Sequence, residues 1–363
     1  MQRISLRHPH GSTPIVIGSG ALAAAGAELS QWCDGRTLFV VSTPRVLALH
    51  GARLRAALAG ARRIEVLPVV EGEAAKSLQT AEELWRAMLR AGGKRDSRVL
   101  AFGGGSVGDL AGFVAGCFLR GVGFAQAPTT LLAQADAAIG GKTAVDVPEA
   151  KNSVGLFHHP DLVVADTDAL ATLPVEELRS GLVETIKVAI LLDLDLLRRI
   201  ESNLDALLAG EPEALTPVVA AAAAAKVRVV EADPEESGER RLLNFGHTLG
   251  HAVETALGYE GLRHGEAVGY GMLFALRLAA RRGLPAADRQ RVAALLRRLG
   301  LPALPRLDAA ELVRLMARDK KALEGGLAWV LPAALGSGRV VLDVAPDELA
   351  AELRGFLADP LAG

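Results

Sequence analysis

The chain has 363 residues, which exceeds the usual size of a single-core domain, so two domains are expected. Its formal net charge is -2 and only 4% of its residues are aromatic, which argues against a basic surface for nucleic acid or acidic membranes. The two cysteines, Cys33 and Cys117, exclude a disulfide framework and fit a protein of the reducing cytoplasm. Neither a secretory signal nor a membrane-spanning segment is expected, and the expected partner is a small molecule.

Short apolar runs alternate with helical stretches through the first half of the chain. Strands are predicted at residues 13–17, 37–41, 64–69, 99–102 and 162–165, and helices at 81–91 and 108–116. This alternation predicts an α/β domain with a parallel sheet over residues 1–173. From Pro174 onward, Leu-, Ala- and Arg-rich stretches with helical periodicity predict a mainly α-helical domain over residues 174–363.

A glycine-rich turn directly follows the strand predicted at residues 99–102. Gly103, Gly105 and Gly108 have the G-x-G-x-x-G spacing, and the helix that follows would offer its N-terminal NH groups to a phosphate. The usual acidic residue about twenty positions on is replaced by Thr129 and Thr130, which argues against an ordinary ribose contact. The alternative is a tight turn without a ligand.

Histidine spacing indicates a metal site. His247 and His251 are four residues apart, which places both imidazoles on one helical face. His264 and Glu184 are further candidates, and a Glu/His/His zinc site with open positions is chemically sensible. Thr248 follows His247 where zinc proteases have glutamate, so peptide hydrolysis is not indicated. Spacing leaves open which two histidines bind, and whether the pair is instead hydrogen-bonded helix packing.

Glu184 and Lys187 are three residues apart on an expected helix that is apolar nearly all round. A surface ion pair is the alternative, but the apolar surroundings predict partly buried charges that need a partner such as a metal or phosphate. Lys142 and Thr143 resemble the end of a P-loop, yet Asp136 stands at the motif's first glycine, which argues against nucleotide hydrolysis.

Eight segments, in order along most of the chain, resemble the 3-dehydroquinate synthase family of sugar phosphate cyclases. They are residues 71–76, 103–109, 120–122, 128–133, 140–143, 151–152, 243–248 and 319–321. The resemblance implies a Rossmann-like NAD-binding domain at residues 1–173 and a helical metal- and substrate-binding domain at residues 174–363. It also implies two cofactors, NAD and a divalent metal, with zinc the usual metal and cobalt the alternative.

The family pattern assigns the site residues. The metal ligands correspond to Glu184, His247 and His264, and the proton-handling residues to His251 and Glu236. The NAD positions correspond to Glu71, Gly72, Glu73, Ala74, Ala75, Lys76, Gly105, Ser106, Val107, Gly108, Asp109, Thr129, Thr130, Lys142, Lys151, Ala169, Leu170, Ala171 and Thr172. The substrate positions correspond to Asp136, Asn152, Lys187, Lys226, Arg240, Asn244 and Lys320 or Lys321. Lys142, Lys187 and Arg120 would stabilise the departing phosphate, and Arg120 resembles a residue that reaches a neighbouring subunit, which implies a homodimer.

The implied reaction converts 3-deoxy-D-arabino-heptulosonate 7-phosphate to 3-dehydroquinate and phosphate, an early step of the shikimate pathway toward aromatic amino acids. Its implied order is transient oxidation with NAD, β-elimination of phosphate, reduction and intramolecular aldol closure. The alternatives are a sister cyclase acting on another sugar phosphate, a metal-dependent polyol or glycerol-phosphate dehydrogenase, and a binding module without activity. Lys226, Arg240 and Asn244 suit a carboxylate and favour the heptulosonate. The chain departs from the family pattern at residues 42–45, 137–139, 150 and 234.

Overall fold

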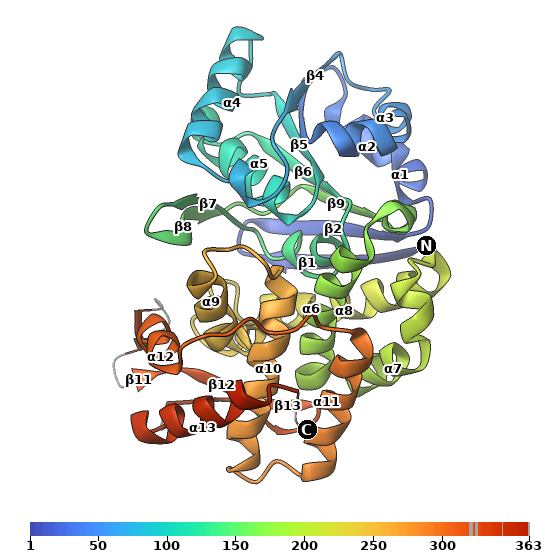
Figure 1. The fold of residues 1–363 in the computed structure, drawn as a ribbon. Coiled ribbons are helices and arrows are strands. Elements are labelled where there is room, and N and C mark those ends of the chain that lie inside the picture. The colour runs from blue at the N-terminus through green and yellow to red at the C-terminus, as the bar shows by residue number, and fades with distance from the viewer. Residues whose placement is uncertain (319–321, 324–325, 343, 362–363) are drawn as a thin grey trace. The chain divides into compact units, whose positions relative to one another are not determined.

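The computed structural model describes residues 1–318, 322–323, 326–342 and 344–361, and the chain divides into two compact units (Figure 1). The first unit comprises Met1–Pro174 and Ala209–Glu235, and the second comprises Val175–Leu208 and Glu236–Gly363. The prediction of one boundary after residue 173 assigned residues 209–235 to the second domain. The structure groups them with the first unit, because helix α8 (Pro212–Ala232) packs against that unit's first two strands.

The first unit has the predicted α/β organisation. Its strands are β1 (Gln2–His8), β2 (Gly11–Gly18), β3 (Thr37–Ser42), β4 (Arg63–Pro68), β5 (Arg98–Gly103), β6 (Gly123–Pro128), β7 (Lys142–Val147), β8 (Ala150–Phe157) and β9 (Leu162–Asp166). Besides α8, its helices are α1 (Ala21–Ala24), α2 (Gly26–Cys33), α3 (Pro44–Ala57), α4 (Leu78–Arg90) and α5 (Gly105–Cys117), with short turns η1 (Glu73–Ala75), η2 (Phe118–Arg120), η3 (Ala133–Ala137) and η4 (Thr167–Thr172).

Seven strands form one sheet in the order β1-β2-β9-β6-β5-β3-β4. All neighbours are parallel except β1, which is antiparallel to β2, while β7 and β8 pair as a separate antiparallel hairpin. The five predicted strands are confirmed as β2, β3, β4, β5 and β9. The prediction missed β1, β6 and the hairpin.

Helices lie on both sides of the central strands (Figure 1), and side chains of these strands alternate between two buried clusters. Phe39 and Val41 of β3 join a buried cluster with residues of α4 and α5. Leu38 and Val40 of the same strand join a second cluster with residues of α1, α2 and α3. Because this strand is buried on both faces, its sequence is an unbroken apolar run rather than an alternating one.

The second unit is mainly helical, which confirms the prediction. Its elements are α6 (Val175–Leu192), α7 (Leu194–Leu208), η5 (Glu239–Asn244), α9 (His247–Ala256), α10 (His264–Ala280), α11 (Ala286–Leu299), α12 (Ala309–Arg318), α13 (Pro346–Ala358) and the short strands β10 (Ala322–Leu323), β11 (Gly326–Leu327), β12 (Trp329–Ala334) and β13 (Ser337–Val341). Within the described residues, no helix has the length and apolar character needed to cross a membrane.

Helix α10 is buried along most of its length and packs against α6 and α9. Two glycines permit this close packing. A Cβ atom at Gly265 would lie 2.1 Å from the carbonyl oxygen of Ser180 on α6, and one at Gly271 would lie 1.8 Å from the carbonyl oxygen of Gly246, which precedes α9. The three helices therefore approach one another at backbone distance, and their side chains converge.

Candidate active site

Three predicted metal ligands lie together in the second unit on three different helices. Glu184 lies in the middle of α6, His247 is the first residue of α9, and His264 is the first residue of α10. One possible ligand atom from each lies within 4.8 Å of the others. His247 Nε2 is 3.7 Å, and His264 Nε2 is 3.5 Å, from Glu184 Oε1. The two histidines that face the carboxylate are thus the pair that the family pattern indicated.

Both imidazoles are held through their other ring nitrogen. His247 Nδ1 lies 3.2 Å from the carbonyl oxygen of Phe245, and His264 Nδ1 lies 3.1 Å from Glu254 Oε2. With Nδ1–H as the donor in each bond, Nε2 presents its lone pair toward Glu184. Burial lowers the pKa of His264, but Glu254 and Glu184 outweigh that effect and raise the pKa overall.

Glu184 and its neighbour Lys187 are buried, with exposed fractions of 1% and 2%. The prediction of buried charges is confirmed, and the alternative of a surface ion pair is wrong. Lys187 Nζ lies 2.6 Å from Glu184 Oε2, a close buried ion pair, while Glu184 Oε1 faces the Nε2 atoms of His247 and His264. A buried carboxylate that faces two imidazole nitrogens fits a divalent metal such as zinc, which takes these ligand types.

His251 lies one turn along α9 from His247. Its ring centroid is 5.2 Å from that of His247 and 5.9 Å from that of His264. Possible ligand atoms of His251, Glu254 and His264 form a second group within 4.8 Å. Glu254 is a residue that the sequence analysis missed. Its position seven residues after His247 and three after His251 puts it on the same helical face, and that spacing was the available signal.

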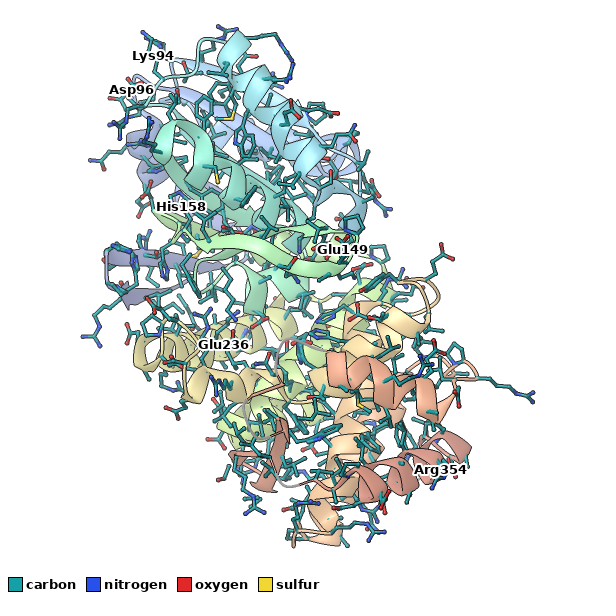
Figure 2. All side chains as sticks on the ribbon, turned by 90° about the vertical axis from the view of Figure 1, so that its left-hand side faces the viewer. Lys94, Asp96, Glu149, His158, Glu236 and Arg354 are labelled. Atoms are coloured by element: carbon teal, nitrogen blue, oxygen red, sulfur yellow. The ribbon has the colours of Figure 1, made fainter. Side chains whose placement is uncertain are left out.

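The segment before α9 carries three further predicted residues. Asn244 Nδ2 donates to Glu236 Oε1 over 2.7 Å, and Arg240 is 2% exposed. Glu236, labelled in Figure 2, has a φ of 61°, a strained conformation for a residue other than glycine. The second unit therefore brings Glu236 and Asn244 together, while Lys320 and Lys321 lie outside the described residues.

The predicted NAD positions lie in the first unit, mostly after the carboxyl ends of parallel strands. Residues 71–76 follow β4, 105–109 follow β5, 129–130 follow β6, and 169–172 follow β9. Such ends meet at one edge of a sheet, which is where open α/β sheets bind ligands. The N-cap residue of α5 is Gly104, which has no side chain to cap that helix, so its N-terminal NH groups suit an anionic phosphate.

Lys76 is buried and is the centre of a partly buried polar group that we call the Lys76 cluster. Its Nζ lies 2.9 Å from Asp109 Oδ2, 3.3 Å from Glu73 Oε1 and 4.0 Å from Asp146 Oδ1. It also donates to the side-chain oxygen of Asn152. Burial alone would lower the pKa of Lys76, but the carboxylates raise it overall. The cluster joins the loop after β4, helix α5 and the β7–β8 hairpin.

Other predicted residues of the first unit lie on separate elements. Asp136 lies in η3, and its Oδ1 is 2.7 Å from Nζ of Lys226 on α8, so these two predicted substrate residues are brought together. Lys142 is exposed at the start of β7, and Lys151 is half-buried on β8. Arg120 is exposed at the end of η2.

Comparisons with known proteins cover both units. Residues 66–180 match the family model of the 3-dehydroquinate synthase N-terminal domain, and residues 181–322 match that of the C-terminal domain. A 3-dehydroquinate synthase of Symbiobacterium thermophilum is 45% identical over 343 residues, which cover 93% of this chain and 95% of that protein.

Two solved structures have similar folds over nearly the whole chain. One is 2-deoxy-scyllo-inosose synthase complexed with carbaglucose-6-phosphate, NAD+ and Co2+, which is 25% identical with a TM-score of 0.88 and covers 98% of this chain and 100% of that one. The other is 2-epi-5-epi-valiolone synthase from Streptomyces hygroscopicus with NAD+ and Zn2+ bound, which is 32% identical with a TM-score of 0.86 and covers 96% and 97%. Because both family models match and the Symbiobacterium thermophilum enzyme is 45% identical over most of the chain, this chain belongs to the 3-dehydroquinate synthase family of enzymes.

Proposed function

We propose that this enzyme converts 3-deoxy-D-arabino-heptulosonate 7-phosphate into 3-dehydroquinate and phosphate, with NAD and a divalent metal as cofactors. The observation that carries the proposal is the buried Glu184 carboxylate facing the Nε2 atoms of His247 and His264. These three side chains would hold zinc or cobalt, since both ions accept carboxylate and imidazole ligands. The relatives solved with NAD+ and with Zn2+ or Co2+ support the choice of cofactors.

When bound, the metal and NAD would supply Lewis-acid chemistry and reversible hydride transfer. The protein's own side chains handle protons and charge. His251 and Glu236 would move the protons of the redox step, because each is a weak acid or base able to change protonation during turnover. Lys142, Lys187 and Arg120 would stabilise the negative charge that develops on the departing phosphate.

The remaining polar residues would bind the substrate's carboxylate and hydroxyls. These residues are Asp136, Asn152, Lys226, Arg240 and Asn244, together with Lys320 or Lys321. A cationic side chain and an amide suit a carboxylate, which distinguishes a heptulosonate from sugar phosphates that have no carboxylate. The substrate preference therefore depends on Lys226, Arg240 and Asn244.

NAD would occupy the strand-end loops of the first unit. The N-terminus of α5 would bind its phosphates, with residues 71–76, 129–130 and 169–172 around the rest of the cofactor, and with Lys142 and Lys151. Lys76 has a supporting part in this proposal. Its ammonium already contacts acidic groups of three segments, so it would hold these segments in place for NAD.

We also propose a homodimer that works in the cytoplasm. Leu119 and Arg120 have φ values of 48° and 67°, a strained turn of the kind that is kept where a side chain has a function. Arg120 is exposed there, and the family resemblance suggests that it reaches the partner subunit. The presence of only two cysteines fits a reducing compartment.

One assay separates the proposed function from its alternatives. Purified enzyme is mixed with zinc, NAD and 3-deoxy-D-arabino-heptulosonate 7-phosphate, and phosphate release and NADH absorbance are followed together. Phosphate release without net NADH is the expected result, since the hydride is returned. Stoichiometric NADH without phosphate would identify a dehydrogenase. No change with this substrate, but phosphate release from another sugar phosphate, would identify a sister cyclase.

A further inference from the structure

Glu254 contacts one of the proposed metal ligands from a neighbouring helix. It lies on α9 with 6% of its surface exposed, and its Oε2 is 3.1 Å from Nδ1 of His264, the first residue of α10. The other ring nitrogen of His264 lies 3.5 Å from Glu184 Oε1. The imidazole is therefore placed between two buried carboxylates, one at each nitrogen.

The two proposed histidine ligands differ in what holds them. His247 Nδ1 faces the carbonyl oxygen of Phe245, which belongs to its own segment and is neutral. His264 Nδ1 faces a carboxylate from another helix. A carboxylate on the far nitrogen fixes ring orientation and makes the near nitrogen a stronger donor to a metal. His264 is the first residue of its helix, and its side chain is 34% exposed, compared with 11% for His247. Surrounding residues therefore restrict the His264 ring less, and a hydrogen bond from another helix has a larger effect on its orientation.

We propose that Glu254 is a positioning residue, which fixes the orientation and tautomer of His264 so that its Nε2 faces the metal site. The inference rests on the proposed function, because it takes His264 to be a metal ligand. It also explains the sequence of α9, in which His247, His251 and Glu254 follow one another along a single face. One helix face thus carries a ligand, a proton-handling residue and the support of a second ligand.

A different arrangement would use the same atoms. His251, Glu254 and His264 could hold a metal of their own, since one ligand atom of each lies within 4.8 Å of the others. Such a metal would bind Nδ1 of His264 and replace the hydrogen bond to Glu254. The distance of 3.1 Å between Nδ1 and Oε2 suits a direct hydrogen bond, and two ligands of one zinc would be separated by a similar distance. The number of zinc ions per wild-type chain therefore distinguishes the two arrangements.

The test measures metal affinity of the full chain, without turnover. Metal-free wild type, Glu254→Gln and Glu254→Ala are titrated with zinc against a chromophoric chelator. We expect affinity to fall roughly 10–100-fold, with Glu254→Ala the weaker binder, because Gln keeps an acceptor for Nδ1–H but loses the charge. Cobalt-loaded Glu254→Gln should also show a shifted visible spectrum. Glu352→Gln, a buried carboxylate on α13, is the matched control and should bind as wild type does.

Each contrary outcome has its own meaning. Unchanged zinc affinity in both Glu254 variants would overturn the positioning role. Two zinc ions per wild-type chain, falling to one in Glu254→Ala, would overturn it in favour of a second metal site. If wild type binds no zinc, or His264→Ala binds it equally well, the proposed metal centre fails as well. A weaker affinity for Glu254→Gln with an unchanged urea midpoint of the metal-free protein would exclude a merely structural effect.

Discussion

Each unit has a cluster of charges around a buried side chain, Lys76 in the first and Glu184 in the second, and the two clusters are satisfied differently. Every acidic group of the Lys76 cluster accepts a hydrogen bond from the protein: Asp109 from Lys76, Glu73 from Ser106, and Asp146 from the backbone of Asn152. Glu184 in the second unit has the Lys187 ammonium at one oxygen, while its other oxygen faces the Nε2 atoms of two imidazoles. The protein completes the first cluster by itself, whereas the second has the donor set that a metal would complete.

The comparison teaches how burial can be used in two ways. Buried polar groups lower stability unless they have partners, and a fully connected network holds the segments that contribute to it. The Lys76 cluster therefore stabilises three segments of the first unit. The centre around Glu184 keeps part of its bonding capacity for a ligand, so its stability should depend on that ligand.

The largest effect is expected from Lys76→Met. The substitution removes the buried shared cation and leaves three partly buried acidic groups facing one another, which should lower the free energy of unfolding by about 3–5 kcal/mol. Urea unfolding followed by circular dichroism measures the change. Lys94→Met is the matched control, because Lys94 extends from the surface of the same unit (Figure 2). A loss below about 1 kcal/mol would show that the cluster does not hold the first unit together.

The next effect concerns metal binding in the second unit. His264→Ala should lose zinc affinity by more than about 100-fold, or roughly 3 kcal/mol, since it removes one of three ligands. His251→Ala should keep its zinc and lose turnover by roughly 10²–10⁴-fold, as expected for a proton-handling residue. Zinc content after dialysis against a chelator, measured beside phosphate release, distinguishes the two. Full zinc content in His264→Ala would remove this residue from the ligand set.

Lys187→Met should lower the free energy of unfolding by a smaller amount, which depends on whether zinc is bound. In the metal-free protein, Glu184 would lose its ammonium neighbour, and the free energy of unfolding should fall by about 1–3 kcal/mol. With zinc bound, the metal would neutralise the same carboxylate, so the loss should shrink. Urea unfolding with and without zinc tests this difference. An equal loss with and without zinc would mean that protein side chains alone balance the charge of Glu184, as they do in the Lys76 cluster.

The fold was predictable where burial leaves a periodic pattern. The five strands found from sequence are rich in apolar and β-branched residues. Strand β6 was missed because it has few of these residues and contains Gln126, although Gln126 is buried against α5. The polar hairpin β7–β8 was missed for the same reason. Helix α8 is apolar on most faces, so its sequence does not say which unit it covers.

The site was predictable to the level of residue types and helical faces. Spacing identified His247 and His251 as a pair, but the structure places His247 with His264 around Glu184. That arrangement depends on the close packing of α6, α9 and α10 that Gly265 and Gly271 permit, which is a tertiary property. Glu254 escaped notice for a related reason, since its partner His264 lies on another helix.

The smallest change in the free energy of unfolding is expected from an exposed ion pair, which shows how little a charge pair contributes without burial. Glu82 and Arg86 lie one turn apart on α4, 2.7 Å from each other, with side chains 58% and 67% exposed. Glu82→Gln should lower the free energy of unfolding by only about 0.3–0.5 kcal/mol, because water already solvates both charges. The effect should fade as salt is added. If urea unfolding instead showed a loss comparable to that of Lys76→Met, proximity of opposite charges rather than burial would govern stability, and the contrast between the two clusters would lose its physical basis.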